Sequence, residues 1–196
     1  MSVSEVTTGR GSDDRVLDAL HVCITKWGID KVTIDDIAET SGVSRASIYR
    51  MFPGGKDVIF EALRVRNLNE FFEGMRHSMG DVESLLDLVV QVSVYAIDEL
   101  RRDEQLLSML ATEESRTIRE LTVDGLPRTI RVASNYLLPF VSEFLPREAG
   151  EHFVDLLARL VISHFLAPSP LVDLGDPDSA RGFFAPLVAF AAPANG

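Results

Sequence analysis

Apolar residues recur at helical spacing along nearly the whole chain, and no segment alternates apolar and polar residues in the manner of a β-strand. This periodicity predicts an all-α protein. No internal repeat and no low-complexity segment interrupts the pattern. The chain has 196 residues, of which 46% are hydrophobic, so it is long and apolar enough to bury one large core or two small ones.

N-cap residues, glycines and prolines divide this pattern into separate helices. The first part of the chain predicts short helices at about 12–27, 33–41 and 44–52. The rest predicts helices at about 56–78, 82–102, 127–145, 147–166 and from 177 onward, with shorter ones near 103–122. We expect Pro139 to kink the helix that begins near Pro127, and Pro186 to bend the last one.

The second and third predicted helices form a helix-turn-helix over residues 33–52. Gly42 suits the left-handed turn between them, Val43 follows it as an apolar contact, and Ile48 is the apolar anchor of the second helix. With these residues facing inward, the others of the second helix face solvent. They are Arg45, Ala46, Ser47, Tyr49 and Arg50.

The charge of the chain is distributed unevenly. The formal charge is −11, but residues 10–66 hold nine basic and nine acidic residues, whereas residues 67–196 hold ten and twenty. Residues 40–56 contain three basic residues and no carboxylate. Residues 67–196, with their excess of acidic residues, would repel a polyanion. The basic stretch at residues 40–56 is therefore the part of the chain suited to contact DNA.

Helix N-termini and basic side chains give this stretch the chemistry of a DNA-binding surface. Thr33 and Ser44 begin two helices, whose N-terminal ends attract phosphate. Arg45 suits the edge of a guanine, and Tyr49 suits the DNA backbone. The predicted DNA-binding residues are Thr33, Ser44, Arg45, Ala46, Ser47, Tyr49, Arg50 and Lys56.

A helix–glycine–helix corner also occurs in proteins that never bind DNA, so further features must decide. Here they are the amphipathic helix before the corner, the carboxylate-free stretch, and a Tyr-x-x-Phe ending followed by Gly-Gly-Lys. Through VTIDDIAETSGVSRASIYRMFPGGKDVIF, residues 10–70 resemble the N-terminal domain of TetR-family transcriptional regulators. One departure from the family pattern is Pro53-Gly54-Gly55, which precedes Lys56.

The resemblance implies a homodimer that places two recognition helices in successive major grooves of operator DNA. It also implies that residues 71–196 form a helical domain that binds a small effector and dimerises. The candidates for its pocket are polar residues and methionines on otherwise apolar helical stretches, although each polar one also fits a satisfied core group. They are Met75, His77, Met79, Tyr95, Met109, Asn135, Tyr136 and His164.

The last two predicted helices carry more apolar residues than one buried face requires. Because a monomer rarely exposes so large an apolar patch, we expect a two-fold contact of four helices to cover it. The residues predicted for this contact are Phe153, Leu156, Leu160, Phe184, Leu187 and Val188.

Catalytic and metal-binding patterns are missing from the sequence. Cys23 is the single cysteine, the four histidines lack metal-ligand spacing, and there is neither a Gly-rich phosphate loop nor a nucleophile elbow. We therefore expect no enzyme, no metal and no cofactor. The sequence also lacks a signal peptide and any run of ~18 apolar residues, which predicts a cytoplasmic protein without a membrane partner.

The sequence is thus interpreted as a ligand-responsive repressor whose partners are operator DNA, a second copy and an apolar or amphipathic effector. The alternative is a helical interaction module, or a DNA-associated structural protein, without an effector. A cavity on the order of several hundred Å³ would favour the sensor, and a solidly filled interior would favour the alternative.

Overall fold

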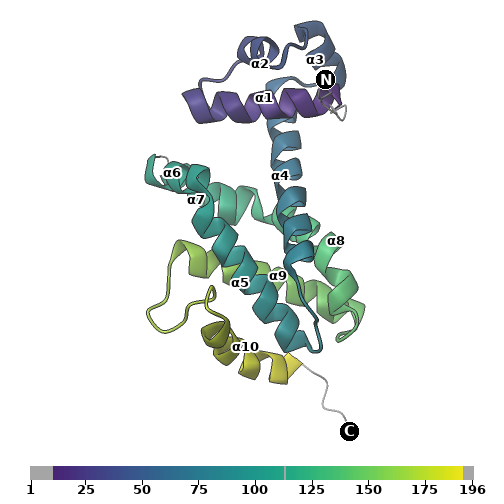
Figure 1. Ribbon diagram of the computed structural model, residues 1–196, viewed down its shortest axis with the longest axis vertical. Helices are drawn as coiled ribbons and strands as arrows, with labels where there is room; N and C mark the ends of the chain where they lie inside the picture. Colours follow the sequence, from purple (N-terminus) through teal and green to yellow (C-terminus); the bar gives the residue numbers. More distant parts are fainter. Residues whose placement is uncertain (1–10, 113, 192–196) are drawn as a thin grey trace, which may run out of the picture. The chain divides into compact units, whose positions relative to one another are not determined.

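The computed structural model describes residues 11–112 and 114–191, and every regular element in these ranges is helical (Figure 1). The predicted all-α class is therefore confirmed. The chain divides into two compact units, with the boundary after Asn67. The sequence placed the boundary between domains after residue 70. No described helix combines the length and the hydropathy needed to span a membrane.

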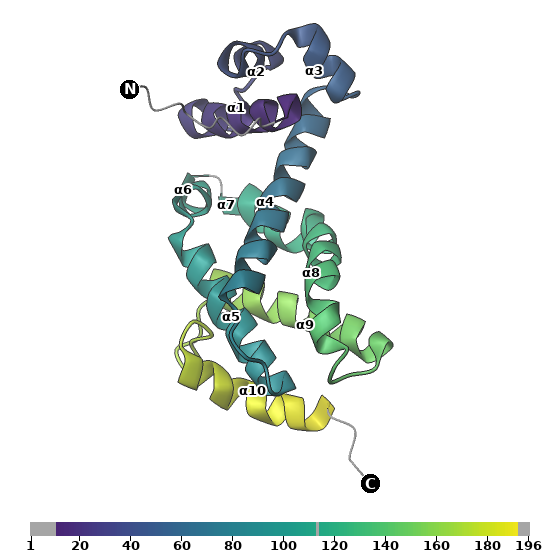
Figure 2. The same cartoon turned by 45° about the vertical axis from the view of Figure 1, so that its right-hand side comes forward.

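The first unit is a small cluster of helices around one apolar core. Its elements are α1 (Ser12–Trp27), α2 (Ile34–Ser41), α3 (Arg45–Met51) and the first part of α4 (Lys56–Ser78). Helix α1 packs against both α2 and α3, as Figures 1 and 2 show. Leu20, Ile37, Ile48 and Ile59 come from these four helices, and all are fully buried in the core.

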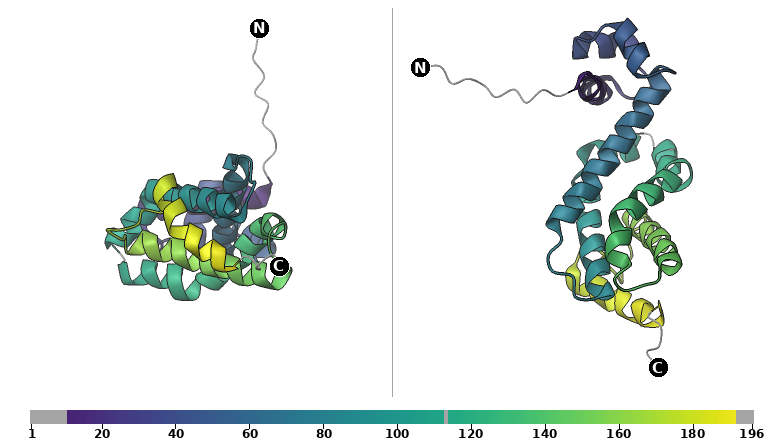
Figure 3. Two further views of the ribbon diagram at one scale, coloured as in Figure 1. Left: turned by 90° about the horizontal axis from the view of Figure 1, so that it is seen from below. Right: turned by 90° about the vertical axis from the view of Figure 1, so that its right-hand side faces the viewer.

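The second unit contains the rest of α4 and all later elements. These are α5 (Leu85–Arg102), α6 (Glu104–Thr112), α7 (Glu114–Arg119), the π-helix η1 (Glu120–Asp124), α8 (Leu126–Val141), α9 (Arg147–Leu166) and α10 (Pro177–Ala191). Helix α5 packs against α9 and α10, and α8 lies beside α9 (Figure 3). Helix α5 is the central helix of this unit.

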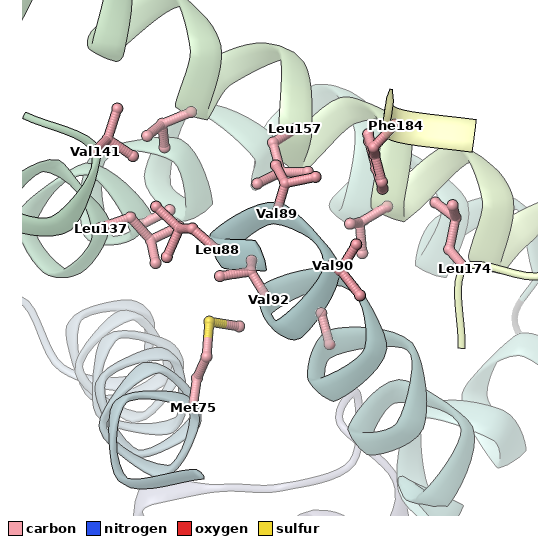
Figure 4. Packing of buried hydrophobic residues seen from close by; sticks show 14 of the residues in the cluster. Met75, Leu88, Val89, Val90, Val92, Leu137, Val141, Leu157, Leu174 and Phe184 are labelled. Carbon is pink, nitrogen blue, oxygen red and sulfur yellow. The ribbon is translucent and has the colours of Figure 1, made fainter. Parts of the chain in front are cut away.

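The core of the second unit lies on several sides of α5. In Figure 4, Met75 of α4 points toward Val92 of α5, while Val89 lies near Leu157 of α9. On a further side of α5, the core continues to Phe184 of α10. A helix that is apolar on several faces must be enclosed by others, so α5 explains why this unit needs α4, α8, α9 and α10 around it.

Helix boundaries follow the local signals closely, with three differences. Helix α5 begins at Leu85 and not near residue 82, because the Ser84 hydroxyl accepts a hydrogen bond of 3.1 Å from the backbone N–H of Asp87. Helix α8 ends at Val141 and not near residue 145, because the N–H groups of Glu143 and Phe144 donate to carbonyl oxygens three residues back and form a tighter turn. The π-helix η1 was not predicted.

Candidate nucleic-acid interface and ligand cavity

The corner between α2 and α3 has the geometry of a helix-turn-helix. Gly42 adopts a φ of 67°, the left-handed conformation that the sequence predicts, and its N–H donates to the carbonyl oxygen of Ala38 over 3.0 Å. Val43 and Ile48 are buried at 7% and 0% exposure, and they anchor the turn and α3 in the core. This anchoring determines which face of α3 reaches solvent.

A capping box begins α2. The Thr33 hydroxyl donates to Asp36 Oδ2 over 2.6 Å, the Thr33 N–H donates to the same oxygen, and the Asp36 N–H donates back to Thr33 Oγ1. The hydrogen bond from the Thr33 hydroxyl, followed by that from its N–H, lowers the pKa of Asp36. A phosphate near this end of α2 therefore meets an ionised carboxylate as well as the positive end of the helix.

Ser44 caps α3 and so positions the candidate recognition helix. Its hydroxyl accepts a hydrogen bond from the Ser47 N–H over 3.2 Å and lies 3.0 Å from the Ser47 hydroxyl. Ser47 is half-buried by this arrangement. The remaining side chains of the predicted reading face are exposed: Arg45, Ala46, Tyr49 and Arg50.

The two arginines of this face differ in their surroundings. Arg45 Nη1 forms an ion pair of 2.9 Å with Asp35 Oδ1 of α2, and both side chains are nearly two-thirds exposed. Within the described part of the chain, Arg50 has no ion-pair partner. Residues 40–56 lack a carboxylate in sequence, but the fold brings Asp35 against Arg45. The predicted DNA-binding face is therefore not free of carboxylates, because Asp35 of α2 lies beside Arg45.

We expect Asp35→Asn to strengthen DNA binding modestly, because it frees Arg45 and removes a negative charge near the phosphates. An exposed ion pair contributes ~1 kcal/mol at most, so the gain should be no more than about fivefold. Fluorescence anisotropy with operator and scrambled DNA at fixed salt would measure it. Glu39→Gln, the same charge change elsewhere on α2, is the control. An equal gain in that variant would attribute the effect to net charge and not to Arg45.

The turn before α4 explains the departure at Pro53-Gly54-Gly55. Gly54 and Gly55 have φ values of 115° and 71°, which favour glycine, and a Cβ at Gly54 would come within 2.7 Å of Val58 Cγ2. The turn leads directly into Lys56, whose Nζ donates to the carbonyl oxygen of Asp30 over 3.5 Å and lies 5.3 Å from the Phe60 ring centroid. Lys56 is half-buried, unlike the arginines of α3.

The second unit contains an apolar cavity of about 140 Å³. Its walls come from α4, α5, η1, α8 and α9, and Thr129 is the one polar residue among them. The Thr129 hydroxyl donates to the carbonyl oxygen of Gly125 over 3.3 Å. The lining residues are Leu68, Phe71, Phe72, Met75, Val92, Ala96, Leu100, Leu121, Thr129, Ala133, Leu137, Val154, Leu157, Ala158, Val161 and Ile162.

Of the eight predicted pocket residues, the structure places only Met75 in this wall. His77 and Asn135 are exposed, and His77 Nδ1 lies 2.7 Å from the carbonyl oxygen of Glu73. The others are half-buried outside the cavity wall: Met79, Tyr95, Met109, Tyr136 and His164. The prediction differs from the structure because it selected polar residues and methionines, whereas the cavity wall consists mostly of other apolar side chains.

Two of the excluded residues have aromatic partners that explain their positions. The Tyr136 ring stacks on Phe72 with centroids 5.9 Å apart, and the His164 ring meets the edge of Phe183 at 5.3 Å. These contacts fit the alternative interpretation of the sequence, in which the polar residues are core groups and not pocket residues. The wall residues of α9 carry a signal that was overlooked: Val154, Leu157 and Val161 recur at helical spacing on one face.

The adjoining apolar face of α9 forms a groove with α10. Leu156 and Leu187 are 51% and 43% exposed there, whereas Phe184 is buried. Leu157 is part of both this groove and the cavity wall. The groove contains all six residues that the sequence predicts for dimerisation, in the set Phe153, Leu156, Leu157, Leu160, Phe184, Leu187 and Val188.

The known proteins to which the chain is similar are described as transcriptional regulators. Residues 16–63 match the family model "Bacterial regulatory proteins, tetR family". An HTH-type transcriptional regulator of Mycobacterium tuberculosis, Rv2250c, is 28% identical over 127 residues, which are 61% of this chain and 65% of the relative, less than two thirds of its length. The regulator AqdR of Rhodococcus erythropolis is 39% identical over 57 residues, which are 29% of this chain and 28% of that protein.

Solved structures share the fold of the chain. The TetR family repressor AlkX from Dietzia sp., implicated in biodegradation of n-alkanes, superposes with a TM-score of 0.66 at 21% identity, over 93% of this chain and 98% of AlkX. The fatty acid degradation regulator FadR from Bacillus halodurans gives a TM-score of 0.53 at 17% identity, over 96% and 98%. At such identities the likeness concerns the fold and leaves the ligand to be argued from the cavity.

Proposed function

Because this chain is a TetR-family transcriptional regulator, we propose that it is a homodimeric repressor that a small apolar effector releases from operator DNA. Proteins of this family regulate transcription and are not enzymes. The observation that carries the proposal is the exposed face of α3, where Arg45, Tyr49 and Arg50 project while Ile48 anchors the helix. The same role would place the protein in the bacterial cytoplasm with its DNA.

The groove between α9 and α10 supports the dimer. Leu156 and Leu187 remain about half exposed in a single chain, and a second copy of the same face would cover them by two-fold symmetry. Two copies of α3 would then read half-sites one helical turn of DNA apart, ~34 Å, or a multiple of it.

The cavity supports an effector-driven release. Four wall residues, Leu68, Phe71, Phe72 and Met75, belong to α4, which begins at Lys56 a few residues after α3. A ligand releases DNA only if it binds better to a form in which the two recognition helices are wrongly spaced. A ligand that displaces the wall of α4 has a direct way to favour such a form.

Selection of bound sequences from a random DNA pool would test the proposal. We expect enrichment of a two-fold symmetric site whose half-sites are about 10–10.5 base pairs apart, or a multiple. Mapping that site to the genome would also identify neighbouring genes. A pool that yields no preferred sequence would contradict sequence-specific regulation.

The size of the cavity keeps one alternative in view. At about 140 Å³ it is smaller than the several hundred Å³ set as the criterion for a sensor. An interaction module without an effector would have the same helices and no ligand response. Binding of a small apolar ligand to the full-length protein would favour the sensor, and no such binding would favour the interaction module.

We expect a side chain at Gly74 to alter the effector response more than operator affinity without effector. A Cβ at this position of α4 would overlap the hydroxyl of Tyr95 and lie 3.5 Å from its Cζ. Gly74→Ala should therefore force α4 and α5 to adjust, and adding Tyr95→Phe should restore the response by removing the overlapping atom. Titration of the operator complex with a small apolar compound such as toluene measures the effect.

Tyr95→Phe alone is the matched control for this pair. An identical release curve for the wild type and Gly74→Ala would show that α4 does not transmit the signal at this position. Failure of Tyr95→Phe to rescue Gly74→Ala would assign the effect to glycine itself and not to the contact between α4 and α5.

A further inference from the structure

We infer that the ligand of the cavity is a small, neutral, hydrocarbon-like molecule about the size of benzene, and that an ionised group on the ligand prevents binding. The inference rests on the proposed function and specifies the ligand class of the same site. It distinguishes a wholly apolar effector from an amphipathic one with a charged head group.

The chemistry of the cavity wall supports a neutral, apolar ligand. Fifteen of the sixteen lining residues are apolar, and the sixteenth, Thr129, already donates its hydroxyl proton to the carbonyl oxygen of Gly125. A carboxylate or ammonium in such a wall would lose its hydration without gaining a partner. A neutral apolar ligand incurs no such cost and gains from the removal of its surface from water.

Two charged residues that are next in sequence to wall residues form an ion pair with each other. Glu120 precedes the wall residue Leu121, and Arg128 precedes Thr129. Arg128 Nη1 lies 3.0 Å from Glu120 Oε1, with side-chain exposures of 14% and 34%. An anionic ligand that sought this guanidinium would have to compete with a carboxylate already bound to it, which disfavours anion recognition here.

The volume of the cavity supports a ligand about the size of benzene. A volume of about 140 Å³ is close to the ~150 Å³ of an engineered cavity, in another protein, that is lined by Leu, Ile and Phe, stays dry and binds benzene. Aromatic rings are present in the wall here as well, with Phe71 and Phe72 in edge-to-face contact at 5.1 Å. A ring or a short alkyl chain fits within such a volume.

Three ligands of one ring size test the charge requirement: toluene, benzoate and benzylamine. Isothermal titration with the full-length protein at pH 7 should detect toluene binding, with benzoate and benzylamine weaker by at least about thirtyfold. Ala133→Leu and Ala158→Leu, which fill the cavity from two different helices, should each weaken toluene binding at least about tenfold. Ala111→Leu, at an exposed site on α6, is the matched control and should leave binding unchanged.

Two further variants sharpen the outcome. Thr129→Val removes the wall hydroxyl and should change toluene binding by less than about twofold, because the ligand needs no hydrogen bond. Loss of toluene binding in Thr129→Val, no toluene binding by the folded wild type, or benzoate binding as tight as toluene would each overturn the inference. Benzoate binding that disappears in Arg128→Met would instead identify an anion site at the ion pair.

Release of operator DNA is measured separately, so the two proposals can fail independently. Toluene binding without release from DNA would preserve the ligand class and refute the proposed repressor switch. Release by an ionised compound that enters the cavity would preserve the switch and refute the ligand class.

Discussion

Replacing Arg50 with alanine is expected to raise the dissociation constant of the operator complex by roughly 5- to 150-fold, since a bidentate base contact contributes ~1–3 kcal/mol. Arg50 is exposed on α3 and has no ion-pair partner in the described part of the chain, so its guanidinium is available to DNA. Arg45→Ala should have an effect of similar size, reduced by the loss of the Asp35 pair that DNA must open. Anisotropy at fixed salt is the measurement.

Lys56→Ala supplies the comparison for these arginine variants. Loss of a phosphate contact should weaken the binding of operator and scrambled DNA alike, whereas loss of a base contact should relax the sequence preference at one base pair. The thermal midpoint should stay near that of the wild type because Arg45 and Arg50 contribute nothing to the core. Unchanged operator affinity in both arginine variants would refute α3 as the recognition helix.

Leu156→Glu is expected to convert the dimer into monomers and to weaken operator binding by more than about 100-fold, because a monomer engages only one half-site. Leu156 is 51% exposed in the single chain, so the fold should tolerate the carboxylate while a covered two-fold interface should not. Light scattering at micromolar concentration measures the assembly. Leu171→Glu, at an 89% exposed position outside the groove, is the matched control and should remain dimeric.

A monomeric wild type under these conditions would refute the proposed architecture. A Leu156→Glu variant that stays dimeric would retain the dimer but relocate its interface away from the groove between α9 and α10.

Elements that depend on local signals could be predicted from the sequence. The helix start at Thr33, the left-handed Gly42 and the anchor Ile48 are short-range features, and the structure has each of them where the sequence predicts it. The extents of α4 and α9 also agree with the spacing of their apolar residues. Such signals act within a few residues, so a single sequence contains them.

Features that depend on contacts between distant residues could not be predicted in the same way. The Arg45–Asp35 pair joins two helices, and the cavity wall combines residues from α4 to α9. The π-helix η1 has a longer hydrogen-bonded ring than an α-helix, so an α-helical period misplaces Leu121. Leu121 therefore reaches the cavity from a position that helical spacing does not indicate.

Leu157 lies where two faces of α9 meet and belongs both to the cavity wall and to the groove. If the groove is the dimer interface, ligand occupancy and self-association are thermodynamically linked through this helix. A ligand that changes the dimer dissociation constant by some factor must have its own affinity changed by the same factor when the chains associate. The effector concentration needed for release would then depend on how many copies of the protein a cell contains.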